Sequence, residues 1–184
     1  MADIMENVAG KLKISKDLLT KICIGVVAVI AVLCVLKVVG GGGGYVKPFK
    51  AYAKAISKND AKKYTKTMSD DMLKYIEEKK GVDDIEDYYS DSIDNTVDAY
   101  EKEYGDDIKV TYKLVDKIKL TKDELEDLND AFDDDKDWDF GEIKKGYQLV
   151  FKVTVKGDDE KTSYFRTAEV VKVKGKWVDL RELY

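Results

Sequence analysis

An unbroken apolar run near the start of the chain limits how this protein can fold. Residues 22–36 read ICIGVVAVIAVLCVL, fifteen apolar or small positions without a charge. With Lys37 snorkelling and Val38 and Val39 closing the stretch, a helix over 22–39 is about 27 Å long at 1.5 Å per residue. This length matches the hydrocarbon core of a bilayer and exceeds the apolar core of an ordinary signal peptide. The run therefore predicts one uncleaved transmembrane helix.

The remaining sequence divides around this span into a short tail over 1–21, a glycine-rich linker over 40–47 and a domain over 48–184. The five glycines of the linker do not extend a helix cheaply, and Pro48 suits the first turn of the next one. The domain is long enough to bury one hydrophobic core. The sequence thus predicts a single-pass membrane protein with one polar domain on its C-terminal side.

The orientation of the span in the membrane is harder to predict, because lysines are almost equally frequent on its two sides. A short tail followed by one span is how exported domains are usually tethered. We therefore expect location in the cell membrane, with a cytoplasmic N-terminus and an extracytoplasmic domain. A cytoplasm-facing membrane scaffold is the alternative.

The composition of the domain excludes several kinds of chemistry. Histidine is absent from the whole chain, and both cysteines, Cys23 and Cys34, lie inside the apolar run. The domain therefore has no disulfide, no thiolate nucleophile, no histidine base and no zinc site of the usual ligands. It also has no glycine-rich phosphate loop. We expect no cofactor.

Hydrophobic periodicity within the domain changes from helical to strand-like at about residue 108. Helices are expected from Val46 to Ile56, from Asp60 to Met68, from Ser69 to Gly81 and from Val82 to Gly105. Thr121 and Glu124 form a capping box that opens a short helix to Phe132. Alternating residues predict strands over 108–120, 147–155, 164–173 and 177–180. This order predicts an α+β domain with helices packed on one face of a curved antiparallel sheet.

Three segments carry a resemblance to a known superfamily: PFKAYAKAISKNDAKKYTKTMS at the start of the domain, the helical middle, and VVKVKGKWVDL near its end. They resemble the cone-shaped nuclear transport factor 2-like (cystatin-like) superfamily, in particular small lysine-rich bacterial domains tethered outside the membrane by one N-terminal helix. The resemblance covers residues 46–184 and implies a pocket between helices and sheet. The superfamily includes isomerases, dehydratases and cyclases as well as members that only bind or dimerise, so it indicates a fold more than an activity.

Asp116 is the candidate catalytic residue, because it falls on the apolar side of the 108–120 strand. A carboxylate there is costly unless it is paired or lies in a wet cavity. If this face lines the implied pocket, Asp116 is the best general base or polar anchor, and Arg166, also on a mostly apolar face, is its candidate partner. The alternative is a β-bulge near residue 115 that turns Asp116 outward.

An acidic segment over 133–142 raises the question of a metal site, since Asp135, Asp137 and Asp139 alternate before Gly141. An EF-hand loop that starts at Asp135 needs glycine at its sixth position and glutamate at its twelfth, but Phe140 and Gly146 stand there. A solvated charged loop is the favoured interpretation, with a looser oxygen-ligand site as the weaker one.

Charge is segregated along the domain. Residues 45–68 carry a net charge of +6, residues 69–107 carry −11, and residues 121–142 carry −9. Lys47, Lys50 and Lys54 in the basic first helix are candidate contacts to anionic lipid headgroups. Nucleic acid is not an expected partner of an acidic domain.

These features together predict a membrane-tethered, non-catalytic binding module whose partners are the bilayer and a protein, or a second copy through the exposed face of the sheet. An isomerase- or dehydratase-type enzyme that uses Asp116 is the alternative. A pocket filled by tyrosine and phenylalanine side chains favours the binding module.

Overall fold

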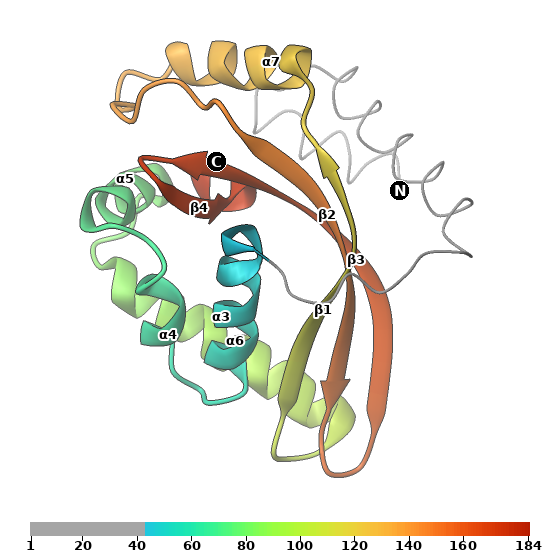
Figure 1. Ribbon diagram of the computed structural model, residues 1–184. Helices are drawn as coiled ribbons and strands as arrows, with labels where there is room; N and C mark the ends of the chain where they lie inside the picture. Colours follow the sequence, from blue (N-terminus) through green and yellow to red (C-terminus); the bar gives the residue numbers. More distant parts are fainter. Residues whose placement is uncertain (1–42) are drawn as a thin grey trace, which may run out of the picture. The chain divides into compact units, whose positions relative to one another are not determined.

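The structure is a computed structural model that describes residues 43–184 (Figure 1). The expected tail, the expected span over 22–39 and the first three linker residues lie outside these residues. Within 43–184, no helix combines the length and the apolar character that a membrane crossing requires.

Four α-helices and a short 3-10 helix form the first half of the domain. Gly44–Val46 (η2) leads into α3, Lys47–Ile56, with Pro48 in its first turn. The next helices are α4, Lys62–Thr65; α5, Asp70–Lys80; and α6, Ile85–Tyr104. The Ser69 side chain caps α5 and a left-handed Gly81 ends it, as the sequence predicts. The long helix α6 begins later than predicted, because the side chain of Asp84 accepts hydrogen bonds from Glu86 N and Asp87 N and caps the helix there.

The second half is an antiparallel sheet of four strands in the order β1-β2-β3-β4. The strands are β1, Lys109–Lys119; β2, Gly146–Lys156; β3, Lys161–Val173; and β4, Lys176–Asp179. Helix α7, Lys122–Asp133, connects β1 to β2 and begins with the predicted Thr121–Glu124 capping box. A short helix η3, Leu180–Leu183, follows β4, where the sequence predicted that the strand would continue to Leu180.

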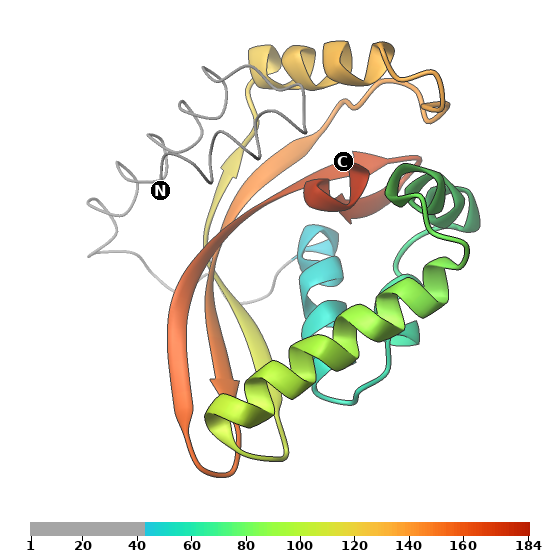
Figure 2. The same ribbon diagram turned by 180° about the vertical axis from the view of Figure 1, so that it is seen from behind.

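Helices α3, α4, α5 and α6 lie on one side of the curved sheet, which confirms the α+β layering (Figures 1 and 2). We call this side of the sheet the inner face and the opposite side the outer face. The core between the layers is rich in aromatic rings: the Phe49 ring of α3 lies 4.7 Å from Phe151 and 6.2 Å from Tyr112, measured between centroids. The tyrosine-bearing stripe of α6 is buried at Tyr89 and Tyr104, as predicted.

One extra residue in β1 changes which side chains face the helices. Leu114 pairs with Phe151, whereas Asp116 pairs with Val150, so Val115 forms a β-bulge. Before the bulge, Val110, Tyr112 and Leu114 point inward; after it, the alternation is reversed. The alternative of a bulge near residue 115 is therefore confirmed.

Candidate functional site

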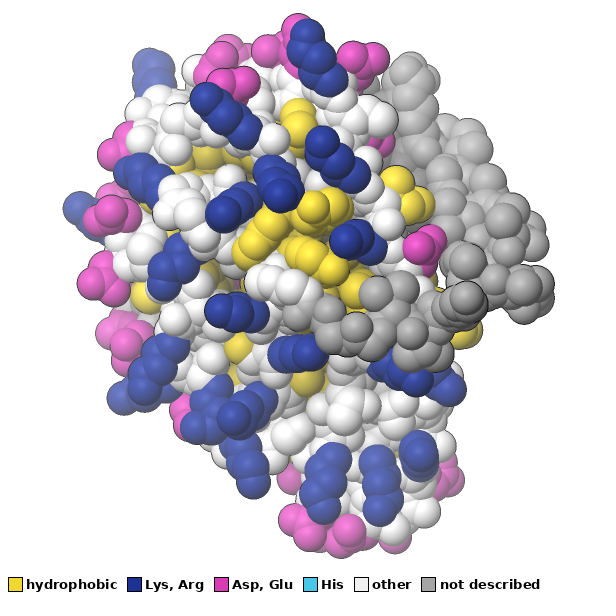
Figure 3. Space-filling model, in the orientation of Figure 1, with side chains coloured by type: hydrophobic (Ala, Val, Ile, Leu, Met, Phe, Trp, Pro, Cys, Tyr) yellow, Lys and Arg dark blue, Asp and Glu magenta, His cyan; other side chains and the backbone are white. Residues whose placement is uncertain are grey.

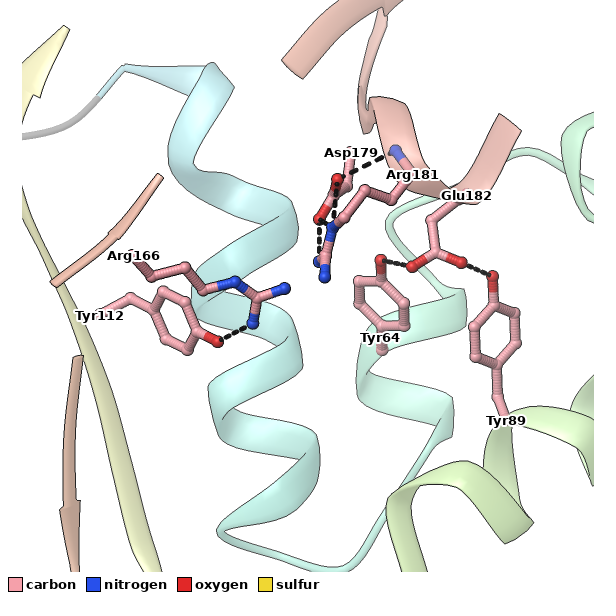
Figure 4. Close-up of polar contacts among 7 residues, drawn as sticks. All are labelled: Tyr64, Tyr89, Tyr112, Arg166, Asp179, Arg181 and Glu182. Atoms are coloured by element: carbon pink, nitrogen blue, oxygen red, sulfur yellow. Dashed lines mark hydrogen bonds and ion pairs between the residues drawn. The ribbon is translucent and has the colours of Figure 1, made fainter. Parts of the chain in front are cut away.

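The most highly connected polar cluster joins the C-terminal end of the sheet to the helices. It contains Arg166 and Arg181, the two arginines of a chain that has thirty lysines. Figure 4 shows their guanidinium groups pointing toward the same region between β3, η3 and α3. The other members are Tyr64, Tyr89, Tyr112, Asp179 and Glu182.

Asp179 is the most buried charged group of this cluster, with 2% of its surface exposed. Its carboxylate accepts hydrogen bonds from the Arg181 backbone N and from Nε and a terminal nitrogen of the same guanidinium. Burial, together with the nearby Glu182, raises the pKa of the Asp179 carboxyl to about 8, against the opposing effect of Arg166. The planar fork of arginine suits this two-point contact, which a lysine ammonium does not reproduce.

Glu182 connects the C-terminal helix η3 to two helices of the other layer. Its Oε1 accepts a 2.9 Å hydrogen bond from Tyr64 Oη of α4, and its Oε2 accepts a 2.6 Å bond from Tyr89 Oη of α6. Burial and the negative charge of Glu182 both raise the pKa of the two phenols well above the ordinary value. Both tyrosines therefore remain neutral hydrogen-bond donors throughout the physiological pH range.

Arg166 lies on the inner face of β3, opposite Phe151. Its Nη1 donates a 2.8 Å hydrogen bond to Tyr112 Oη, and its guanidinium carbon is 5.9 Å from the Tyr112 ring centroid. Burial alone lowers the pKa of Arg166, but Tyr112 and Asp179 reverse the effect and raise it. Arg166 therefore remains a permanent cation beside the aromatic core.

The contacts of this cluster hold elements together, and Asp179, with a pKa of about 8, is the member that titrates near neutral pH. Each carboxylate is already bonded to an arginine or to tyrosines, and the tyrosine pKa values lie too high for acid–base chemistry near neutral pH. Among residues 43–184, no fully buried side-chain nitrogen or oxygen lacks a hydrogen-bond partner. Arg166 is the member with donors to spare, since one hydrogen bond, from Nη1 to Tyr112, is recorded for its guanidinium among the described residues.

The structure separates the two residues that the sequence suggested as a catalytic pair. The bulge at Val115 places Asp116 on the outer face, in the row of Val150 and Thr167, where its Oδ1 accepts a hydrogen bond from Lys117 N. Arg166 points to the inner face and bonds to Tyr112 instead. A pairing of Asp116 with Arg166 does not occur, because the sheet lies between their side chains.

The acidic segment also has partners other than a metal. Asp135 binds Lys79 Nζ at 2.6 Å and Tyr75 Oη at 2.7 Å, Asp137 binds Lys79 at 3.2 Å, and Asp139 lies 3.3 Å from Lys174. Burial opposes the ionisation of Asp135, but Lys79 and Tyr75 outweigh it and lower the pKa of this carboxyl. In the described part of the chain, no group of three or more potential ligands is arranged to hold a metal.

Lysines dominate much of the surface seen in Figure 3, where acidic side chains gather mainly near the margins. Lys47, Lys50 and Lys54 are exposed along one side of α3, as their predicted role requires. A second group stands on the outer face of the sheet: Lys109, Lys156 and Lys161 form one cross-strand row, and Lys113 and Lys152 lie beside Phe165 in another. We call these five lysines and Phe165 the lysine face.

No protein-family model, curated protein or solved structure matches this chain.

Sequence patterns did not reveal the polar cluster. Tyr64 and Glu182 are 118 residues apart, and helical spacing predicts core packing, but no polar contact, for the tyrosine stripe of α6. Composition carries one signal: the chain has two arginines among thirty lysines, and one of them, Arg181, makes a two-point contact with Asp179.

Replacing Glu182 should reveal how strongly the C-terminus is tied to the helices. Glu182→Ala leaves two largely buried tyrosine hydroxyls without their acceptor, so we expect a loss of about 2–4 kcal/mol in denaturant unfolding. Glu182→Gln, which keeps one acceptor oxygen, should cost less. Tyr89→Phe should destabilise the wild type by about 1 kcal/mol but not the Glu182→Ala variant. Equal effects of Tyr89→Phe in both backgrounds would contradict the network.

The raised pKa of Asp179 predicts a pH dependence of stability. Because the folded carboxyl binds its proton up to about pH 8 and the unfolded one only up to about pH 4, the folded state holds the extra proton between these values. Stability should therefore fall as pH rises from about 4 to 8, by up to about 1.4 kcal/mol per unit. Asp179→Asn should remove this contribution in urea titrations at several pH values. An unchanged slope in that variant would show that the carboxyl does not titrate in this range.

Proposed function

We propose that this protein is a membrane-tethered, non-catalytic binding module whose lysine face docks an acidic protein partner. The apolar run over 22–39 supports the tether, and the layering of helices on a curved sheet supports the resemblance to the nuclear transport factor 2-like superfamily. We further propose that the domain lies outside the cytoplasm.

The main support for this proposal is the composition of the lysine face. Phe165 is 66% exposed, an unusual degree for a phenylalanine on a strand, and it lies directly across from Lys152. No described carboxylate is within salt-bridge distance of the five lysines. An apolar anchor framed by unpaired cations is typical of a surface that meets an acidic partner.

Electrostatics also favours an acidic partner over a second copy on this face. Lysines directly opposite each other on neighbouring strands repel, and here the rows of Lys109 and Lys113 each contain such pairs. A symmetric dimer would bring two such faces together and add to the repulsion. The acidic turn at Asp158, Asp159 and Glu160 lies beyond the Lys109 row, so Lys113 and Lys152 form the uncompensated centre.

The geometry gives less support to an enzyme. The inner face, which would line a pocket, is occupied by aromatic side chains such as Phe49, Tyr112 and Phe151. The proposed base Asp116 lies on the other side of the sheet. A filled inner face is what we expect of a domain that binds through its surface.

The tether and its orientation are tested on the full chain in cells. We expect the protein to remain in the membrane pellet after carbonate extraction at high pH. An alkaline phosphatase fusion at Tyr184 should be active, and a cytoplasm-dependent fluorescent fusion at the same residue should be dark. Release by carbonate would refute the tether, and the reverse fusion pattern would favour the cytoplasmic scaffold.

Docking on the lysine face is tested by placing a photo-crosslinking residue at Phe165 of the full chain. Tyr164 is the matched control, because it is adjacent and 40% exposed but points to the inner face. We expect crosslinks to one acidic protein from position 165 and not from 164. Lys113→Glu with Lys152→Glu should abolish them, whereas Lys62→Glu with Lys66→Glu, an equal charge change on α4 and its C-cap, should not. Equal capture from 164, or capture that ignores the charge reversal, would contradict the proposal.

A further inference from the structure

A second group of aromatic and basic side chains surrounds the point where the described chain begins. The Tyr45 ring centroid lies 5.0 Å from that of Tyr147 and 5.9 Å from that of Trp177, and the latter two rings are 5.4 Å apart. A methyl group on Gly44 would lie 3.0 Å from Cδ1 of Trp177, so the backbone itself passes against the indole. All three rings are only partly buried.

Four exposed lysines, from strands β1 and β3 and from the loop before β2, stand around these rings. Lys117 Nζ lies 4.8 Å from the centroid of Tyr45 and 5.2 Å from that of Tyr147, and it donates a 3.3 Å hydrogen bond to Tyr45 Oη. Lys145 Nζ lies 6.0 Å from the Tyr147 ring. Lys119 pairs across the sheet with Tyr147, and Lys172 pairs with Trp177. We call the seven residues the collar: Tyr45, Lys117, Lys119, Lys145, Tyr147, Lys172 and Trp177.

The collar depends on the bulge in β1. With the regular alternation of the first part of this strand, Lys117 and Lys119 would point to the outer face. Because Val115 is inserted, both lysines instead share the face of Leu149 and Tyr147. Ile118 is moved outward at the same time and becomes 41% exposed. An apolar side chain is thus exposed while two lysines are gathered beside the aromatic rings.

We propose that the collar seats the domain on the anionic lipid headgroups around the membrane span. Tyrosine and tryptophan prefer the headgroup level of a bilayer because one end of the ring system is apolar and the other is polar. Lysines within a Debye length of anionic lipids are attracted to them. The collar combines both features, and no described carboxylate is within salt-bridge distance of its lysines.

The short linker favours lipid headgroups over other molecules as the binding partner of the collar. The inference rests on the tether of the proposed function, which ends at Val39. Five glycines separate this residue from Tyr45, and even a fully extended chain of that length spans only about 20 Å. The collar therefore cannot move far from the bilayer surface, and lipid headgroups are the material that surrounds it there.

With the collar on the membrane, we expect other lysines than those of α3 to make most of the lipid contacts. Lys47, Lys50 and Lys54 lie along α3, which leads away from the collar over ten residues, or about 15 Å. Of these three, Lys47 is the one close to the collar in sequence, two positions after Tyr45. The strand lysines, rather than the far end of α3, are the main lipid contacts of this proposal.

The two tryptophans of the chain offer a direct test on the full-length protein. Trp138→Phe leaves Trp177 as the only indole, and Trp177→Phe leaves Trp138, which stacks at 4.2 Å on Phe132 and has no collar residue among its aromatic neighbours in the described part of the chain. Each variant is reconstituted into vesicles that contain lipids brominated near the headgroup end of the acyl chain. We expect Trp177 fluorescence to be quenched at least twofold more in phosphatidylglycerol-rich vesicles than in phosphatidylcholine vesicles, and Trp138 fluorescence to be equal in both.

Neutralising collar lysines tests whether anionic lipids attract the collar or whether the collar is merely close to the membrane. Lys117→Gln with Lys145→Gln should reduce the extra quenching of Trp177 in anionic vesicles, and Lys62→Gln with Lys66→Gln should leave it unchanged. Equal quenching of the two tryptophans, or quenching that ignores lipid charge, would overturn the collar proposal while the chain still floats with the vesicles. A chain that does not float with the vesicles would instead refute the tether itself.

Discussion

The single extra residue at Val115 determines how this domain presents its charges. A β-strand alternates strictly, so one insertion exchanges the two faces for every residue that follows. Upstream, the inward residues continue the core; downstream, they are Lys117 and Lys119, which stand beside Tyr147 near the beginning of the described chain. The same insertion moves Asp116 away from the helices. A strand without the bulge would bury a carboxylate and lose half of the lysines around the aromatic rings.

A second constraint on the fold comes from residues 179–183, which hold the helices to the sheet. Asp179 and Glu182 lie at the junction of β4 and η3, and through them the last residues contact α4, α6 and the Arg181 guanidinium. In addition, Tyr75 of α5 bonds to the Leu183 carbonyl at 3.4 Å and to Asp135 at 2.7 Å. The short C-terminal helix thus ties three helices to the edge of the sheet.

Local sequence signals predicted the elements of this fold well. Ser69 and Gly81 bound α5, and the Thr121–Glu124 capping box opens α7, because these residues satisfy backbone groups within a few positions of themselves. The alternation of residues 108–114 likewise identified the start of β1. The errors arose where a distant part of the chain decides the outcome. The phase of β1 after Leu114 is set by its pairing with β2, and the acceptor of Tyr64 lies 118 residues away.

The candidate site shows the same contrast between what local sequence predicts and what distant parts of the chain decide. Asp116 was singled out because a regular strand would have placed it inside, and the bulge removes that reason. The acidic residues 135, 137 and 139, for which the sequence favours a charged loop, lie within salt-bridge distance of Lys79 and Lys174. Burial of Tyr89 was predicted from helical spacing, but its hydrogen bond to Glu182 requires the tertiary structure.

The positions of the lysines need a physical explanation beyond composition. A preference for lysine over arginine does not choose between a basic and an acidic residue, and the chain contains 37 acidic residues against 32 basic ones. Even so, the outward rows that begin at Lys109, Thr111 and Lys113 contain five lysines and no carboxylate. Each opposed pair of like charges costs a few tenths of a kcal/mol. Core packing gains nothing from this cost, and for this reason the rows are the basis for proposing an acidic partner.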